Sequence, residues 1–415
     1  MLNNTRMAEE FIKTVEALGK KIDDAWQKQS YRRAVFPDIA AKELSHFKCH
    51  EQFQLEDFLL WVGRRNGCLP QPLESSFGDP PILLFDRNSG FYIEALIWWF
   101  TPVVVHDHSF QGAWQVISGL TLHDIYNFEK TISHNSILNF GKIEHIKTEL
   151  LPVGFIRPIT AGPSFIHRTV HLQKPTVSLV VRTAFDTTHP QQFNYYKDNI
   201  ALRSHSFHGA FNARINKIAS LLTEMKSNKK FEFFQQYIKY APVPEVIDFL
   251  IMNYDCAFGI DGIKALISKT HWKDEPWTEM LVRSIDSYLT SYFLRDFTNV
   301  HDHDQRLLLS MLTSGMSRTY FMKLFPKFFP KTENFAEFVS NHLFDLSQTT
   351  SLTFEMNEKG RDIVAARLTN GSAEKAFYAL SKKADWIKTD NGRDTFHEYS
   401  NTMDTIPLFK TLFGD

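Results

Sequence analysis

The sequence predicts an α+β protein of more than one domain, in which a β-rich segment follows short helices and precedes an all-helical region. At 415 residues the chain is long enough for two domains or three. Its pattern of apolar residues changes twice. Helical periodicity near the N-terminus gives way to short strands over about 82–185, and helical periodicity returns from about residue 206.

Two helices are expected before the strands. Apolar residues recur at helical spacing over residues 7–30 and again over about 52–63. A link rich in glycine and proline, from Cys68 to Pro81, then separates these helices from the β-rich segment.

The β-rich segment contains about eight short strands with no helix between them. We expect them at about 82–86, 91–105, 113–118, 120–128, 143–151, 153–159, 164–171 and 177–185. Glycine and proline mark several joints, for example Gly119, Pro152 and Gly162. This strand count favours a double-sheet jelly roll. The predicted domains are therefore 1–205, with the barrel at about 82–185, and 206–415, an all-helical domain of unknown role.

Composition argues against several classes of partner. The chain has 46 Lys and Arg residues against 47 Asp and Glu residues, for a net charge of −1, so no nucleic-acid partner is expected. Cys49, Cys68 and Cys256 form no CxxC pair and favour a reducing compartment. Since neither a signal peptide nor an apolar run of transmembrane length is found, we expect a cytoplasmic protein without membrane contact.

Three histidines in the β-rich segment are candidate metal ligands. His106 and His108 stand two residues apart after an apolar run, and residues i and i+2 of a strand face the same way. His167, in a second β-like stretch, is the best third ligand. Neutral imidazole is a common ligand of first-row transition metals. Three such ligands leave coordination positions open, as a catalytic site requires, and the lack of cysteine argues against a structural zinc site.

Residues 106–119 resemble the first sequence motif of the cupin superfamily, a family of small jelly-roll barrels. That motif combines HxH with a ligand glutamate and a closing glycine, and Gly119 matches the glycine. Gly112 stands where the glutamate is usual and cannot coordinate a metal. Residues 154–171 loosely follow the second cupin motif, with His167 as its histidine and His171 where asparagine is usual.

Without the glutamate, the motifs are similar to those of the cysteine dioxygenase branch of cupins, the thiol dioxygenases, over about 82–185. The pair His167-Arg168 matches that branch as well. The resemblance implies an Fe(II) oxygenase that oxidises a small thiol or amino-acid-like substrate with dioxygen; Zn, Mn and Ni are alternative metals. Gly112-Ala113 excludes the Cys–Tyr crosslink of some members. Arg87 lies roughly where the family holds a substrate carboxylate, but in a turn.

Three further residues are candidate catalytic residues. Trp114 shares strand parity with Gly112 and is expected to face the barrel interior, as a wall of the site or as core. An arginine inside a small barrel must be paired or bind an anion, so Arg182 is a candidate substrate clamp. Tyr92 could donate a hydrogen bond to bound oxygen. His171 could be a fourth ligand, a residue that supports a metal ligand from behind or a surface residue, and the second of these is favoured.

Other functions stay open on the sequence alone. Oxygenases of the JmjC type, which use 2-oxoglutarate, combine a jelly roll with helices, but their HxD/E triad has a carboxylate where this chain has His108. A second alternative is a non-catalytic cupin that senses a metal or ligand. A third is an enzyme that catalyses isomerisation or hydrolysis without oxygen. The helical region could make a homo-oligomer. A second HxH, His301-Asp302-His303, lies in a polar turn and is interpreted as a solvated loop.

Overall fold

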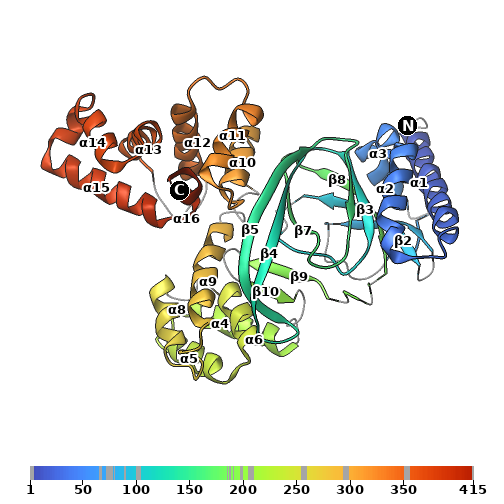
Figure 1. Cartoon of the computed structure of the whole chain (residues 1–415), viewed down its shortest axis with the longest axis horizontal. Helices are drawn as coiled ribbons and strands as arrows, with labels where there is room; N and C mark the ends of the chain where they lie inside the picture. The colour runs from blue at the N-terminus through green and yellow to red at the C-terminus, as the bar shows by residue number, and fades with distance from the viewer. Residues whose placement is uncertain are drawn as a thin grey trace. The chain divides into compact units, whose positions relative to one another are not determined.

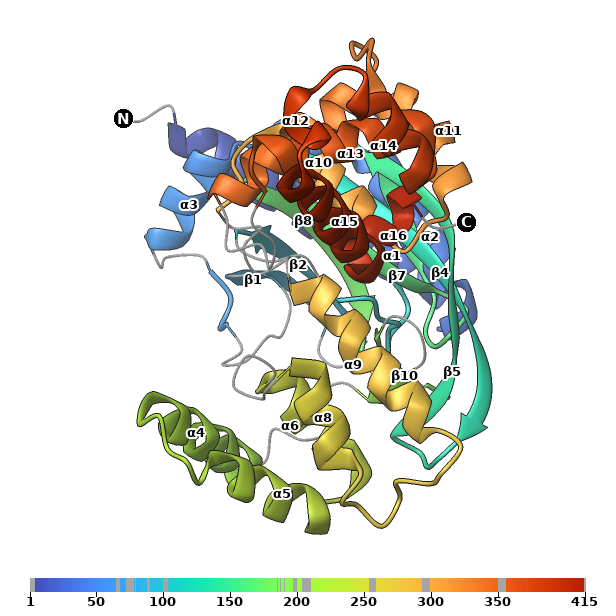
Figure 2. The same cartoon turned by 90° about the vertical axis from the view of Figure 1, so that its left-hand side faces the viewer.

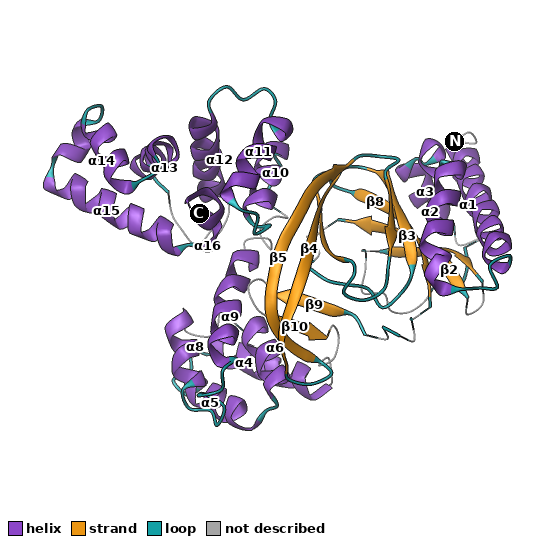
Figure 3. Cartoon of the chain, in the orientation of Figure 1, coloured by secondary structure: helices purple, strands orange, loops and turns teal. Residues whose placement is uncertain are grey.

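The computed structural model describes residues 4–64, 68–71, 78, 80–87, 90–99, 104–184, 186, 188–189, 191–196, 200–203, 210–253, 259–292, 299–349 and 356–413. The chain divides into two compact units, Met1–Ser284 and Ile285–Asp415. Among the described residues, every strand belongs to the first unit and the second unit is helical (Figure 1 and Figure 3). Helices and antiparallel sheets together confirm the predicted α+β class.

Three helices open the first unit: α1 (Asn4–Gln27), α2 (Phe36–Phe47) and α3 (Leu55–Gly63). Helices α1 and α3 confirm the helices expected at 7–30 and 52–63. Helix α2 was not predicted, although Phe36, Ala40 and Leu44 recur every fourth residue and are fully buried. Pro37 lies in the first turn of α2, and Lys48 ends the helix in the left-handed conformation.

The described strands form two antiparallel sheets of five strands each. Sheet A has the order β1-β2-β8-β3-β6, and sheet B has the order β7-β4-β5-β10-β9. The strands are β1 (Pro81–Asp86), β2 (Phe91–Trp98), β3 (Gly112–Ser118), β4 (Thr121–Ser133), β5 (Leu138–Leu151), β6 (Ile156–Ile159), β7 (Ile166–His171), β8 (Thr176–Thr183), β9 (Phe193–Tyr196) and β10 (Ile200–Arg203).

Eight of these strands, β1 to β8, match the strands expected between residues 82 and 185. The expected strand 91–105 is too long, because β2 ends at Trp98; residues 100–103 lie outside the described part of the chain. Strands β4 and β5 are longer than predicted and make one curved hairpin (Figure 2). Strands β9 and β10 were not predicted, because four residues are too few to show a clear alternation.

Sheet A separates two cores. On β8, Leu179 and Val181 pack with the apolar residues of α1, α2 and α3, whereas Val180 and Arg182 face a cavity between the sheets. This division follows from the alternation of side chains along a strand. Figure 1 shows the three N-terminal helices on the outer side of β2 and β3. The helices therefore form the back of the sheet that carries half of the cavity wall.

Helices follow the last strand. The first unit continues with α4 (Ala210–Glu224), α5 (Lys230–Tyr240), α6 (Val243–Met252) and α8 (Gly259–Ile267), and α9 (Thr278–Tyr292) runs across the division between the units. Trp277 stacks on Phe140 of β5, with ring centroids 5.1 Å apart. The change from strand to helix falls between Arg203 and Ala210, beside the predicted boundary at 205, whereas the compact units divide after Ser284.

The second unit contains α10 (His303–Leu312), α11 (Arg318–Phe328), α12 (Phe335–Thr349), α13 (Glu358–Asn370), α14 (Ala373–Ser381), α15 (Asp390–Thr405) and α16 (Pro407–Phe413). None of the described helices is both long enough and apolar enough to cross a bilayer. Cys49 is buried and Cys68 is half-buried, both as free thiols, and Cys256 lies outside the described residues.

Candidate metal centre

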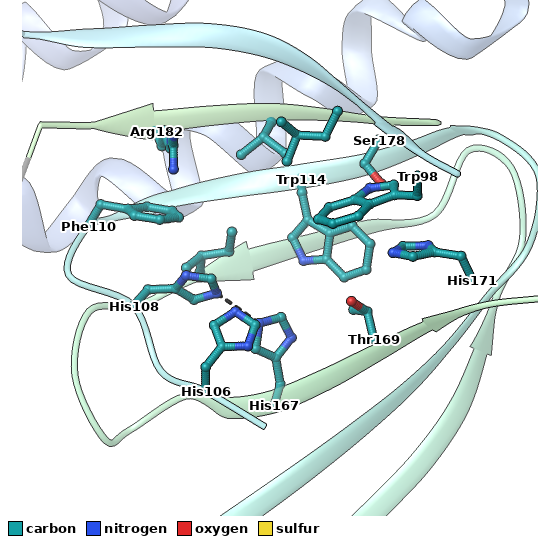
Figure 4. Close-up of a pocket in the computed structure, with 13 residues that line it drawn as sticks. Trp98, His106, His108, Phe110, Trp114, His167, Thr169, His171, Ser178 and Arg182 are labelled. Atoms are coloured by element: carbon teal, nitrogen blue, oxygen red, sulfur yellow. Dashed lines mark hydrogen bonds between the residues drawn. The ribbon is translucent and has the colours of Figure 1, made fainter. Parts of the chain in front are cut away.

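Three histidines from two distant segments converge between the sheets. His106 and His108 lie in the segment between β2 and β3, and His167 lies on β7. One ring nitrogen from each of them lies within 4.8 Å of the others, and all three residues are buried (Figure 4). The structure thus brings together the three imidazoles that the sequence singled out as candidate ligands.

The backbone around His106 produces this convergence. The two histidines of the HxH were expected to lie on a regular strand. His106 instead forms an isolated antiparallel bridge with His167. Each of the two backbone N–H groups donates to the carbonyl oxygen of the other residue at 2.9 Å. Two residues further on, His108 presents its ring on the same side, with its centroid 4.7 Å from that of His106.

Asp107 points away from the three imidazoles. Its carboxylate accepts a hydrogen bond from the backbone N–H of Phe193 at 2.7 Å and another from the hydroxyl of Tyr195 at 2.8 Å. Burial raises the pKa of Asp107 to about 6, although both hydrogen bonds lower it. The middle residue of the HxH therefore anchors the ligand segment to β9 and supplies no ligand.

Hydrogen-bond partners identify the protonated nitrogen of two of the rings. His106 Nδ1 lies 2.8 Å from the carbonyl oxygen of Val104, which can only accept, so Nδ1 carries the proton. His167 Nδ1 lies 3.0 Å from His123 Nε2, and His123 Nδ1 lies 3.1 Å from a carboxylate oxygen of Glu149. An ionised carboxylate only accepts, so both Nδ1 atoms are protonated. Nε2 of His106 and Nε2 of His167 therefore present lone pairs.

This donor set fits a divalent transition metal. His108 Nε2 lies 2.8 Å from His167 Nε2, so a proton or a shared cation must lie between two nitrogens that would otherwise repel. Burial lowers the pKa of His106 to about 4 and holds the pKa values of His108 and His167 well below their usual range. The three imidazoles are neutral near pH 7, which is the form that binds metals.

A small cavity opens beside the three imidazoles. Its volume is about 50 Å³. One water molecule needs roughly 10–15 Å³ by the same kind of measure, so the cavity accommodates an ion and a few further atoms. The residues that line the cavity are His106, His108, Phe110, Trp114, Ile159, His167, Thr169, His171, Leu96, Trp98, Ser178, Val180 and Arg182.

Arg182 faces the cavity and already has an anionic partner. Its Nη2 lies 2.8 Å from Oε1 of Glu94, and its guanidinium lies 4.8 Å from the ring of Tyr92 and 5.1 Å from that of Phe110. Burial raises the pKa of Glu94, and the charge of Arg182 opposes this rise. A substrate anion would have to compete with Glu94 for the guanidinium. Tyr92 contacts Arg182 and is not among the residues that line the cavity.

Trp114 lines the cavity, on the side that strand parity predicted. Its ring lies 6.5 Å from the ring of His167, centroid to centroid. Its Nε1 is buried and has no hydrogen-bond partner in the described part of the chain. A buried N–H group without an acceptor is costly, so this indole is ready to donate to a molecule held in the cavity.

His171 lies toward the other end of the cavity, outside the three-histidine group. Its ring stacks on Trp98 with centroids 4.5 Å apart, and its Nδ1 lies 3.1 Å from the hydroxyl of Thr121. Trp98 Nε1 donates to Ser178 Oγ at 3.2 Å. His171 therefore forms part of the cavity wall, apart from the three-histidine group (Figure 4).

Gly112 has no room for a side chain. A Cβ atom at this position would overlap the carbonyl oxygen of Val181 on the neighbouring strand β8. The backbone of β8 thus occupies the space that a glutamate would need. The centre has three imidazoles because the sheet excludes a fourth ligand here.

Replacing Gly112 with alanine should therefore destabilise the protein. The added methyl must push β3 away from β8, and overpacking of this kind costs about 1–3 kcal/mol or more. Urea unfolding would measure the loss, with Ala113→Gly, at the next position of the same strand, as a comparison for packing changes. A Gly112→Ala variant as stable as the parent chain would contradict this account of the missing ligand.

Four polar residues lie behind the centre, and the sequence analysis missed all of them except Arg168. His123 and Glu149 connect to His167, as described above. Arg168 donates to Asp124 Oδ2 from Nε at 2.9 Å and from Nη2 at 2.6 Å, and both side chains are buried. The pair His123-Asp124 between apolar neighbours on a predicted strand was the available signal, because consecutive titratable residues on a buried strand need partners.

Two other sequence features lie apart from the centre. Arg87 forms an ion pair with Asp23 of α1 and donates to the hydroxyl of Tyr31 at 2.9 Å, and it does not line the cavity. The exposed His301-Asp302-His303 tripeptide begins α10, where Asp302 accepts a hydrogen bond from the backbone N–H of Gln305. That second HxH serves as a helix cap.

Comparison with known proteins gives distant similarities only. No protein-family model and no curated protein sequence matches the chain. Among solved structures, DMSP lyase DddQ from Ruegeria pomeroyi DSS-3 has a TM-score of 0.21 and 12% identity, over 31% of this chain and 62% of that one. The structures of DMSP lyases RdDddP and RnDddQII give a TM-score of 0.23 and 14% identity, over 40% and 93%.

A third solved structure is Peruvianin-I, a cysteine peptidase from Thevetia peruviana latex. Its TM-score is 0.20 at 13% identity, and the match covers 30% of this chain and 71% of that one. TM-scores at this level carry no conclusion about this chain. Its function must therefore be argued from the site itself.

Proposed function

We propose that this chain is a cupin-type, metal-dependent oxygenase, in which His106, His108 and His167 hold Fe(II). The observation that supports the proposal most directly is the convergence of three buried, neutral imidazoles on one cavity between two antiparallel sheets. Three protein ligands leave positions for a substrate and for dioxygen. Bound iron would supply dioxygen activation and would attract a thiolate or another anionic group.

The chain's own residues prepare the cavity for a small substrate. Phe110 and Trp114 exclude water from the metal side, and the small volume excludes large molecules. The indole N–H of Trp114 would orient an acceptor atom of the substrate. Arg182 stays close to Glu94 and holds the cavity wall; it would contact a substrate anion only where that anion outcompetes the carboxylate. Tyr92 acts through Arg182.

The JmjC-type alternative is disfavoured by the ligand set. A 2-oxoglutarate oxygenase of that type needs a carboxylate beside its two histidines. The carboxylate of Asp107 is bound to Phe193 and Tyr195, on the far side of the segment from the imidazoles. A metal sensor without catalysis uses the same three ligands, so the decisive experiment must measure turnover as well as binding.

The proposal predicts one bound metal ion per chain and oxygen consumption that depends on it. The protein would be purified anaerobically without chelator, analysed for metals, loaded with Fe(II) and given small thiols in an oxygen electrode. Chelation with EDTA should abolish oxygen uptake, and added Fe(II) should restore it. A folded protein that binds no first-row transition metal would refute the metal centre.

Two outcomes would replace the oxygenase with another function. Iron-loaded protein that consumes no oxygen with any small thiol or amino acid would favour a sensor. Turnover that persists without oxygen, and with Mn or Zn in place of iron, would favour isomerisation or hydrolysis.

A further inference from the structure

A line of three side chains leads from the metal side of His167 to the surface. His167 lies on β7, His123 on β4 and Glu149 on β5. Strand register aligns them, because His123 is paired directly with Glu149 across β4 and β5, and β7 flanks β4 on its other side. The two hydrogen bonds of the line measure 3.0 Å from His167 to His123 and 3.1 Å from His123 to Glu149.

Glu149 carries a full negative charge at the outer end of this line. Its side chain is 15% exposed, Lys147 Nζ donates to it at 2.6 Å, and Arg157 donates to its other oxygen. Burial alone raises the pKa of Glu149, but hydrogen bonds from His123 and Lys147 and the charge of Arg157 hold it at about 2. His123 itself is completely buried.

His106 and His167 differ in the group that accepts the hydrogen bond from their Nδ1–H. The Nδ1–H of His106 donates to a neutral backbone carbonyl, that of Val104. The Nδ1–H of His167 donates instead to an imidazole that is itself polarised by a carboxylate. A carboxylate behind a ligand imidazole raises the basicity of the metal-facing nitrogen and fixes the ring's orientation.

We infer that Glu149 and His123 are positioning residues for the metal centre, which raise the metal affinity of His167 through a carboxylate–imidazole–imidazole relay. The inference rests on the proposed metal centre. Three neutral ligands leave the charge of a divalent ion uncompensated in a buried site. The relay brings the charge of Glu149 to the ion's ligand shell without adding an anionic ligand, so every open position stays open for substrate.

Cobalt(II) titration of the metal-free full chain tests the relay, with the visible absorption of bound cobalt as readout. Glu149→Gln keeps an acceptor for His123 and removes the charge. His123→Leu removes the relay, and His123→Gln restores an acceptor for His167 Nδ1–H. Changes of this kind behind a metal ligand cost 10–100-fold in affinity, so we expect about 10-fold for Glu149→Gln, about 100-fold for His123→Leu and partial recovery in His123→Gln.

Glu144→Gln, an exposed change on the same strand, is the matched control and should leave the cobalt affinity unchanged. Thermal unfolding of each metal-free variant separates a loss of positioning from a loss of folding. If His123→Leu fails to fold, the cobalt affinity of Glu149→Gln, a change at a partly exposed position, still tests the relay.

The possible failures are distinct. A parent chain that binds no cobalt overturns the metal centre itself. A parent chain that binds cobalt, with Glu149→Gln and His123→Leu binding as tightly as Glu144→Gln, overturns the relay alone. Equal losses in His123→Leu and His123→Gln, with no loss in Glu149→Gln, would also overturn it, because the imidazole would then act only by filling space.

Discussion

Replacing His108 with alanine is expected to weaken metal binding by about 10²–10³-fold. Four-ligand protein sites bind structural zinc with about 10–16 kcal/mol, so one ligand accounts for roughly 2.5–4 kcal/mol, and each 1.4 kcal/mol is a factor of about ten. Oxygen uptake by iron-loaded protein should fall to background with it. Calorimetric titration with a divalent metal, followed by the oxygen electrode, would measure both effects.

His171→Ala provides the matched control. It removes an imidazole that is buried in the same cavity but lies outside the three-histidine group. We expect this variant to retain metal binding within a few-fold of the parent chain while changing the fit of substrate. If His171→Ala lost as much metal affinity as His108→Ala, the ion would have to sit elsewhere in the cavity, and the assignment of ligands would be wrong.

Asp124→Asn should destabilise the first unit by about 3–5 kcal/mol. Its carboxylate accepts two hydrogen bonds from Arg168 and one from Thr148, and it is completely buried. Removing the negative partner leaves the guanidinium buried without compensation, which is what makes a broken buried ion pair so costly. Urea unfolding, followed by tryptophan fluorescence and circular dichroism, would give the change in free energy of unfolding.

The double variant Asp124→Leu with Arg168→Met should recover most of that loss, because it buries no unpaired charge. Glu51→Gln, which breaks an exposed ion pair with Lys48, should have no measurable effect.

Burial raises the pKa of Asp124, yet Arg168 and its other partners hold it at about 2. Since an unfolded Asp titrates near 3.9, the stability from this group is complete above about pH 5 and is lost as the pH falls toward 2. If Asp124→Asn were as stable as the double variant, the buried ion pair of Asp124 and Arg168 could not have the role described here.

The sequence predicted the strand-rich segment well because its strands are punctuated by turn residues. Gly119, for example, has a φ of 87° between β3 and β4, a conformation that glycine adopts without strain. The prediction failed where local pattern is weak. Strand β10 is held by pairing with β5 and strand β9 by pairing with β10, which no property of their four residues indicates.

The three candidate ligands could be named because the HxH spacing and one later histidine carry the signal within short stretches. The residues that support them, His123 and Glu149, could not be predicted, because the partner of His167 is set by strand register. His123 reaches His167 only because β4 lies beside β7, and Glu149 reaches His123 only because β5 lies on the other side of β4. Arg182 was expected to face inward and does so. Its ion pair with Glu94 depends on the adjacency of β2 and β8, which sequence spacing does not reveal.

Sheet A is a single strand layer thick, and this has a consequence for how the cavity can change. Every residue of β8 that packs on the N-terminal helices, such as Leu179, is bonded directly to residues that line the cavity, here Ser178 and Val180. A larger or smaller side chain on the helix side must move the shared backbone, because a packed interior transmits strain. Relatives of this chain could therefore acquire new substrate preferences through drift in the layer behind the sheet, while every residue in contact with the substrate stayed the same.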